Sequence, residues 1–219
     1  MASPSILDFI SDDQLLARYF EGPSWRPWKA VLKGAFGLAG QMTPYERLDF
    51  KKFAGGRKPP KKRVRELVAA IGRGGGKDSA ASAIAVYLAC TSDFSRLRPG
   101  EKGTILCLAN GREQARIAFN YIRGLFEQTP LLKPLIKRVD ASTIELTNRA
   151  EITVLPNNIR ASRGLTLVAA IYDEVAFWLD LDYDRTDSAR RHNDATRRDD
   201  DRSRVRADVD RHLRDHRGR

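Results

Sequence analysis

The apolar pattern of the first 56 residues has helical spacing. A Ser-Asp-Asp-Gln capping box precedes an amphipathic run and predicts a helix over residues 11–20. A second helix is predicted over residues 30–36. Thr-Pro-Tyr-Glu, beginning at Thr43, combines a capping hydroxyl, a first-turn proline and a reciprocal acid, and predicts a third helix that ends near Phe53. Residues 1–56 are therefore expected to form a helical N-terminal region.

The middle of the chain alternates between apolar runs and helical patterns. Apolar runs at residues 67–70, 104–109 and 167–172 have strand length and no alternation, which is typical of strands buried on both faces of a parallel sheet. Helical patterns follow the first two runs, at residues 77–90 and 111–126. The order predicts an α/β fold with a parallel sheet flanked by helices on both faces.

Two smaller elements lie between the second helical pattern and the last apolar run. Thr129 and Pro130 predict a short helix that reaches about Val139. Apolar residues alternate with polar ones at residues 144–146 and 152–154, which predicts a hairpin at the edge of the sheet.

Composition divides the chain into four parts. The helical region 1–56 is followed by a basic linker, residues 57–65, whose prolines keep it extended. Residues 66–178 are expected to form the α/β domain. Residues 179–219 hold 12 Arg and 11 Asp and almost no apolar side chain after Tyr183, so they are predicted to be disordered. We interpret this tail as a frameshifted reading of a GC-rich gene, or alternatively as a charged segment that binds nucleic acid.

The strongest chemical signal is the stretch Ile-Gly-Arg-Gly-Gly-Gly-Lys-Asp-Ser at residues 71–79. Glycines let backbone N–H groups turn toward an anion, the following helix adds its positive end, and Lys77 can reach terminal phosphates. The usual pattern is matched imperfectly, because Ile71 stands at the first glycine, Asp78 at the magnesium-binding hydroxyl, and Ser79 one residue late. The stretch predicts a phosphate-binding loop, with a plain connector as the alternative.

Two adjacent carboxylates, Asp173 and Glu174, directly follow the apolar run 167–172. In P-loop enzymes the first such acid organises Mg²⁺, and the next one polarises the attacking water. A glycine-lysine loop after one strand and an acidic pair after another together predict a single site for ATP and Mg²⁺. The sheet is therefore expected to be a P-loop NTPase-type parallel sheet, and residues 66–178 to form an incomplete P-loop ATPase domain.

Several polar and aromatic residues leave alternatives open. Trp25 and Trp28 are expected to pack within the N-terminal region, with stacking on an adenine ring as the alternative. Arg160 and Arg163 fit ordinary loop charge as well as contact with DNA or with a neighbouring subunit's nucleotide.

The net charge of the chain is +11, and the first 178 residues carry +10 of it. Such a surface indicates a polyanionic partner such as nucleic acid, or charge that serves only solubility. No apolar run approaches the about 20 residues of a membrane span, and the start lacks the pattern of a signal peptide, so a cytoplasmic location is expected. Cys90 and Cys107 lack metal-ligand spacing and are predicted to be reduced core thiols.

These motifs together resemble the ATPase domain of the large terminase subunit, the motor that packages DNA into tailed-phage heads. The resemblance is carried by residues 72–79, by Arg-Gly-Leu-Thr at 163–166 and by Ile-Tyr-Asp-Glu-Val-Ala-Phe-Trp at 171–178. Terminases often have a deviant phosphate loop with an early arginine, here Arg73. The order of elements from Leu7 through Trp178 is similar as well.

The resemblance implies ATP and Mg²⁺ as cofactors. It implies that Lys77 binds the β/γ-phosphates, that Asp173 organises Mg²⁺ through water with Ser79 as a weak substitute ligand, and that Glu174 is the catalytic carboxylate. Arg73 joins Lys77 and Glu174 as a catalytic candidate. The implied nucleotide-binding loop comprises Gly72, Arg73, Gly74, Gly75, Gly76, Lys77, Asp78 and Ser79.

The implied partners are double-stranded DNA, the portal protein, a small terminase subunit and further copies in a homo-oligomeric ring, with no membrane involved. A terminase continues beyond this point through more ATPase strands, a coupling motif and a nuclease domain, so the chain is expected to be truncated before them. Two other functions stay open: a different helicase-like P-loop ATPase, and a catalytically silent fragment that binds DNA or partner subunits.

Overall fold

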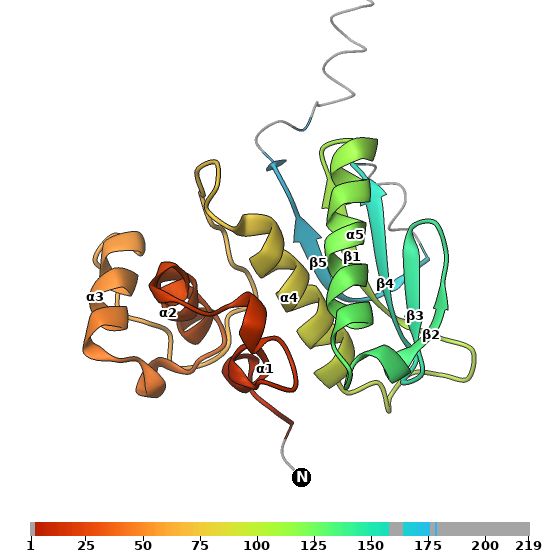
Figure 1. The fold of residues 1–219 in the computed structure, drawn as a ribbon, viewed down its shortest axis with the longest axis horizontal. Coiled ribbons are helices and arrows are strands. Elements are labelled where there is room, and N and C mark those ends of the chain that lie inside the picture. Colours follow the sequence, from red (N-terminus) through yellow and green to blue (C-terminus); the bar gives the residue numbers. More distant parts are fainter. Residues whose placement is uncertain (1–2, 158–163, 176–177, 179–219) are drawn as a thin grey trace, which may run out of the picture. The chain divides into compact units, whose positions relative to one another are not determined.

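The computed structural model describes residues 3–157, 164–175 and 178 (Figure 1). The described helices are α1 (Ile6–Ser11), α2 (Arg26–Ala35), α3 (Pro44–Phe53), α4 (Lys77–Thr91) and α5 (Arg112–Gln128). The described strands are β1 (Gly103–Ala109), β2 (Ile136–Val139), β3 (Thr143–Leu146), β4 (Ala150–Pro156) and β5 (Thr166–Tyr172). Single 3₁₀ turns lie at Ala17–Tyr19, Pro23–Trp25, Ala39–Gln41 and Lys133–Leu135. Among these helices, none has the length and apolar character needed to cross a bilayer.

The α/β class is confirmed, but the sheet is mixed where a parallel sheet was predicted. Its strand order is β2-β3-β4-β1-β5, with β4 and β5 parallel to β1 on its two sides. Strand β3 is antiparallel to both of its neighbours, β2 and β4. The antiparallel half arises because tight connections join these three strands, whereas a parallel pair needs a longer crossover such as α5.

The short helix predicted to reach Val139 is wrong. Only the 3₁₀ turn Lys133–Leu135 forms, and the chain then continues as β2, in which Ile136 pairs with Leu146. β-Branched side chains at both ends of β2, Ile136 and Val139, favour a strand, and this strand pairs with β3 at the edge of the sheet. The hairpin itself is confirmed as β3 and β4, but β4 lies inside the sheet beside β1 and does not form its edge.

The main hydrophobic core lies between one face of the sheet and the helices (Figure 1). Ile105 and Cys107 of β1 belong to this core, whereas the buried Leu106 and Leu108 do not, because successive side chains of a strand point to opposite faces. Both α4 and α5 contribute to the same core. A sheet flanked by helices is thus confirmed, with α4 and α5 in contact with each other on this face, whereas helices on both faces stay a prediction.

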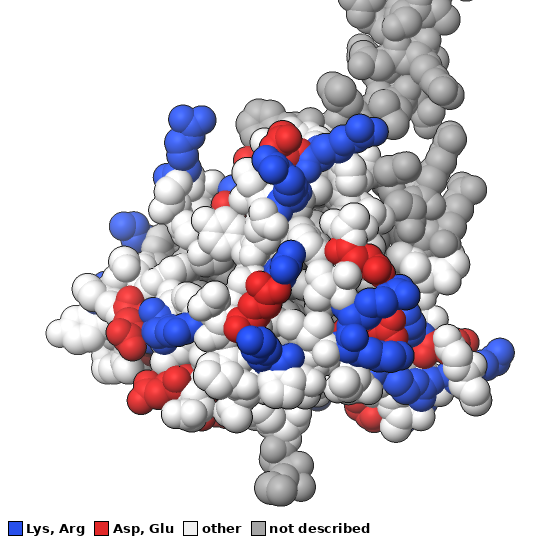
Figure 2. All heavy atoms as spheres, turned by 45° about the vertical axis from the view of Figure 1, so that its right-hand side comes forward, with Lys and Arg blue, Asp and Glu red and all other residues white. Residues whose placement is uncertain are grey.

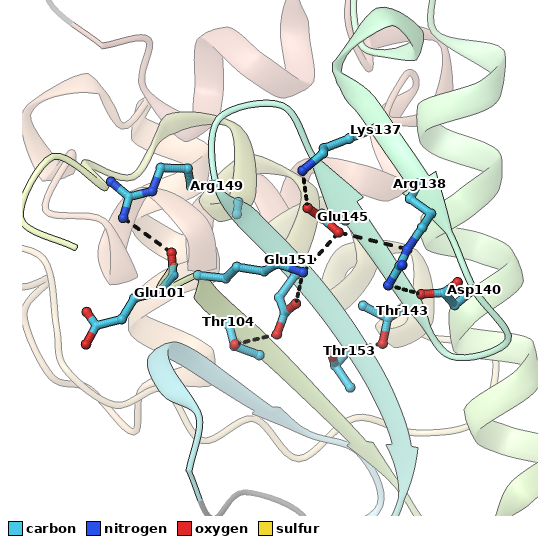
Figure 3. Close-up of polar contacts among 12 residues, drawn as sticks. Glu101, Thr104, Lys137, Arg138, Asp140, Thr143, Glu145, Arg149, Glu151 and Thr153 are labelled. Carbon is cyan, nitrogen blue, oxygen red and sulfur yellow. Dashed lines mark hydrogen bonds and ion pairs between the residues drawn. The ribbon is translucent and has the colours of Figure 1, made fainter. Parts of the chain in front are cut away.

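The other face of the sheet carries a charged network over β2, β3 and β4 (Figure 3). Glu145 accepts hydrogen bonds from Lys137 at 2.7 Å and from Lys102 at 2.9 Å, and these two bonds lower the pKa of Glu145 to about 2. Lys102 also lies 3.5 Å from Glu151, which in turn accepts a hydrogen bond from Thr104. Opposite charges on neighbouring strands stabilise the pairing of this half of the sheet.

In the N-terminal region, the predicted helix over residues 11–20 is wrong. The capping box that forms is Ser5 with Asp8, so α1 begins at Ile6 and Ser11 is its last residue. Asp12 is extended and its carboxylate accepts a hydrogen bond from the backbone of Gln14, which turns the chain away from a helix.

The second and third predicted helices are confirmed as α2 and α3. α3 begins with the predicted capping box of Thr43 and Glu46. Lys33 of α2 bridges both carboxylate oxygens of Glu46 at 2.8 and 2.7 Å, and both side chains are buried. This buried ion pair fixes α2 against α3.

Two of the three apolar runs behave differently from the prediction. Residues 67–70 form no strand, and Val68 is 94% exposed. β5 does form, but Leu167 and Tyr172 remain 45% and 54% exposed, because within the described residues β5 pairs on one side only. β1 alone is buried along its whole length.

The two cysteines are confirmed as free thiols in apolar surroundings. Cys107 is fully enclosed in the core and Cys90 is largely enclosed, and burial raises the pKa of each thiol to about 12. Because the thiolate is the reactive form, both side chains serve packing.

Candidate functional site

The structure brings together the lysine of the glycine loop and the two acids that follow β5. The Nζ atom of Lys77 lies 2.8 Å from Oδ1 of Asp173 and 2.8 Å from Oε1 of Glu174, although 96 residues separate Lys77 from Asp173 in the chain. All three side chains are about two-thirds buried. The two motifs that the sequence predicted to form one site are therefore in direct contact.

Strand direction places these residues at one edge of the sheet. β1 and β5 are parallel, so their carboxyl ends lie at the same edge, and the backbone N–H of Asp173 continues the ladder by donating to the carbonyl of Leu108 at 2.8 Å. α4 begins with Lys77 at this edge. Crevices beyond the carboxyl ends of parallel strands are where open α/β sheets bind their ligands.

The charges of the site are closely coupled. Burial alone lowers the pKa of Lys77, but the hydrogen bonds and negative charges of Asp173 and Glu174 outweigh burial and raise it. Burial and then the charge of Asp173 raise the pKa of Asp78, with Lys77 opposing the shift and Glu174 adding to it. Lys77 therefore contacts two carboxylates directly, and a third, that of Asp78, lies within reach of the same charges.

The backbone at Glu174 is strained. Its φ angle is +52°, in the left-handed region that residues other than glycine seldom adopt. Such conformations cost about 1–3 kcal/mol and concentrate at functional sites, where the surrounding structure holds them. The residue with this conformation is the one whose carboxylate contacts Lys77.

The glycine loop needs its glycines at particular positions. Gly76 has a φ angle of +74°, and a Cβ atom there would lie 3.1 Å from the ring of Trp25. A Cβ atom on Gly75 would lie 2.4 Å from the side chain of Ile71. Gly76 is also the N-cap of α4 and offers no side-chain cap, so the first-turn N–H groups of this 15-residue helix remain available to an anion.

The two N-terminal tryptophans contact this loop. The indole Nε1–H of Trp28 donates a 2.7 Å hydrogen bond to the carbonyl oxygen of Gly75. The ring of Trp25 packs on Phe20 with 4.6 Å between ring centroids and covers Gly76. Packing within the N-terminal region is thus confirmed for Trp25. The contact of both residues with the glycine loop was not predicted, although the alternative of adenine stacking would also have placed them near it.

Other predicted site residues are not drawn into the cluster. Arg73 is exposed on the loop and forms no ion pair with the rest of the described chain, and Gly72 is exposed with open space around it. Ser79 lies in the first turn of α4 and is partly buried. Arg160, Arg163 and the predicted tail 179–219 lie outside the described residues.

The acids at this edge suit Mg²⁺ bound with a nucleotide. The part of the chain that the structure describes holds no group of three or more His, Cys, Asp or Glu side chains arranged as a metal site. Mg²⁺ usually takes one or two carboxylates and completes its shell with water and substrate phosphates. Asp173 and Glu174 match that donor set, so the residues present fit a metal that arrives with its substrate.

Charge is mixed on the surface that Figure 2 draws. Basic side chains there alternate with acidic ones and form no continuous positive surface. No protein-family model matches this chain, and a search of curated proteins finds no match either. Fold and site together define an α/β protein with a lysine-carboxylate cluster at the carboxyl edge of a mixed sheet.

Proposed function

We propose that the chain binds ATP with Mg²⁺ and hydrolyses it, as an ATPase domain of the kind found in large terminase subunits. The observation that carries the proposal is the contact of Lys77, which follows the glycine loop, with both Asp173 and Glu174, which follow a parallel strand. A lysine at a helix start supplies phosphate binding, and carboxylates at a strand end supply metal binding and water activation.

Nucleotide binding requires an exchange of partners at Lys77. The triphosphate would attract the ammonium group away from Asp173 and Glu174, aided by the first-turn N–H groups of α4. The two carboxylates would then exchange their contact with Lys77 for contacts with metal and water. Phosphate binding by Lys77 would thus break its ion pairs with Asp173 and Glu174.

The roles of the acids follow from their positions. Asp173, with Ser79 in the first turn of α4, would hold Mg²⁺, which when bound neutralises phosphate charge. Glu174 would accept a hydrogen bond from the attacking water and orient it, while Lys77 offsets the charge that develops on the phosphate oxygens. The exposed Arg73 would approach the phosphates only after the loop closes on them.

Double-stranded DNA is the proposed polyanionic partner, supported by the +10 charge of the first 178 residues. DNA packaging with a portal protein, a small terminase subunit and a homo-oligomeric ring belongs to the same proposal and rests on the resemblance of the motifs. DNA contact predicts binding that weakens steeply with added salt.

ATP hydrolysis by matched variants tests the proposal. Lys77→Ala and Glu174→Gln should each lower the rate by at least about 100-fold, because each removes a group that acts on the reacting phosphate or water. Lys102→Ala is the control, since Lys102 also bridges two carboxylates but lies at the opposite end of β1. Its hydrolysis rate should equal that of the parent chain.

Two outcomes would contradict the enzyme assignment. Equal hydrolysis by the parent chain and both site variants would mean that the activity arises elsewhere. Absence of hydrolysis in a parent chain that still binds DNA would favour the catalytically silent fragment.

A further inference from the structure

We infer that Trp28 is a positioning residue for the glycine loop, and that its indole N–H sets the loop in the conformation that receives the phosphates. The inference rests on the proposed function and extends it to a residue outside the loop and the acids. It starts from the 2.7 Å hydrogen bond between Nε1 of Trp28 and the carbonyl oxygen of Gly75.

This hydrogen bond fixes one peptide plane of the loop. In a trans peptide the C=O and N–H bonds point in opposite directions. The carbonyl of Gly75 points at Trp28, so the N–H of Gly76 points away from the indole. Glycine on both sides leaves this plane free to rotate, and the indole donor selects one orientation of it.

The loop has few other restraints. The backbone N–H of Gly75 bonds to the carbonyl of Gly72 at 3.1 Å, which closes a turn around Arg73 and Gly74. The glycines themselves bring no side chains that could hold the turn. The carbonyl of Gly76 accepts from the N–H of Ala80 at 3.0 Å, which is the first bond of α4. Among the described residues, Trp28 adds the one hydrogen bond from outside the loop and α4 to the loop backbone.

The donor comes from a rigid support. Trp28 lies in the first turn of α2, and α2 is held to α3 by the buried pair of Lys33 and Glu46. Trp25, one turn earlier, packs on Phe20 of the core and lies over Gly76. The helical N-terminal region therefore supports Trp25 and Trp28 rigidly, and both residues contact the loop.

The positioning role differs from base stacking in what it requires of the ligand. A ring that stacks on adenine strengthens the binding only of ligands that contain a base. A hydrogen bond that fixes the loop conformation strengthens the binding of any ligand that contains the phosphates. Trp28→Phe keeps an aromatic ring and removes the N–H donor. Inorganic tripolyphosphate, which has no base, then separates the two roles.

The experiment measures binding of tripolyphosphate, ADP and ATP to the parent chain and to Trp28→Phe by calorimetry, with hydrogen exchange of the amides of residues 72–77 in the absence of ligand. Because a hydrogen bond of this kind contributes about 0.5–1.5 kcal/mol, we expect about two- to tenfold weaker binding of all three ligands, and faster exchange in the loop. Tyr121→Phe, which removes a donor from an exposed aromatic side chain on α5, is the control and should change neither quantity.

The possible results separate cleanly. Weaker binding of ADP and ATP with unchanged tripolyphosphate binding would overturn the inference in favour of base stacking. Unchanged binding of all three ligands would overturn any role in the site, even if exchange became faster. A parent chain that binds none of the three would overturn the proposed function and the inference with it, whereas a parent that binds them leaves Trp28→Phe as the decisive comparison.

Discussion

β1 and β5 are neighbouring parallel strands of seven mostly apolar residues, yet they have different surroundings. β1 lies between β4 and β5 and is buried at every position. β5 has one described partner, and large apolar side chains such as Leu167 and Tyr172 remain exposed. Burial in this protein therefore follows from the place of a strand in the sheet more than from its composition.

The two strands also differ in what they contribute to the structure. β1 supplies the core with Ile105 and Cys107, while β5 leads into Asp173 and Glu174. The acids that we propose to act on a nucleotide therefore follow a partly exposed strand, whereas the fully buried strand supplies the core.

The largest expected effect is on the central strand. Ile105→Ala should lower the free energy of unfolding by about 2–5 kcal/mol, because it leaves a cavity in a fully buried site. Val168→Ala on β5, where the side chain is 39% exposed, should cost less than about 1 kcal/mol. Urea unfolding of both variants checks the difference, and equal costs would show that β5 is buried as deeply as β1.

The next effect concerns the loop that faces the end of β5. Gly76→Ala should destabilise the protein by about 1–2 kcal/mol, because alanine resists a positive φ angle and its Cβ approaches Trp25. Gly72→Ala is the matched control, since open space surrounds Gly72. Gly76→Ala should change both nucleotide binding and the thermal unfolding temperature, whereas Gly72→Ala should change neither. Similar behaviour of the pair would contradict the loop geometry.

A smaller effect is expected from the third carboxylate at this edge. The pKa of Asp78 is raised, so its ionisation opposes folding as pH rises above its ordinary value of 3.8. Asp78→Asn should raise the free energy of unfolding at pH 7 by less than about 1 kcal/mol, because the site is partly open to solvent. The gain should disappear as pH falls below 3.8. A gain that persists in acid would mean that packing, not charge, causes it.

The smallest effect tests the segment before the loop. Val68→Asp should change the free energy of unfolding by less than about 0.5 kcal/mol, because Val68 is almost fully exposed. The same substitution at buried Val154 of β4 should prevent stable folding. A large loss from Val68→Asp would instead support the strand that the sequence predicted over residues 67–70.

The sequence predicted the elements that long patterns or local hydrogen bonds determine. α3 begins at the capping box of Thr43 and Glu46, and α4, β1 and α5 lie where their apolar patterns placed them. Prediction from the sequence failed where tertiary contacts determine the secondary structure. β2 exists because β3 offers it an edge, and residues 67–70 have strand composition but no strand partner among the described residues.

The candidate site was predictable in part. The pairing of Lys77 with Asp173 and Glu174 follows from two motifs and the rule that parallel strands share a carboxyl edge. The roles of Trp28 on the loop backbone and the strained φ of Glu174 were not predictable, because each depends on three-dimensional placement that no local pattern encodes.

The central claim is that Lys77 and the acids after β5 form a single nucleotide site, and calorimetric titration with Mg²⁺ and a slowly hydrolysed ATP analogue tests it most directly. The parent chain and Lys102→Ala should bind one equivalent with the same affinity, whereas Lys77→Ala should bind at least about tenfold more weakly, since a charge-assisted bond to phosphate contributes about 1.5–3 kcal/mol. Equal affinity in all three proteins would contradict the account.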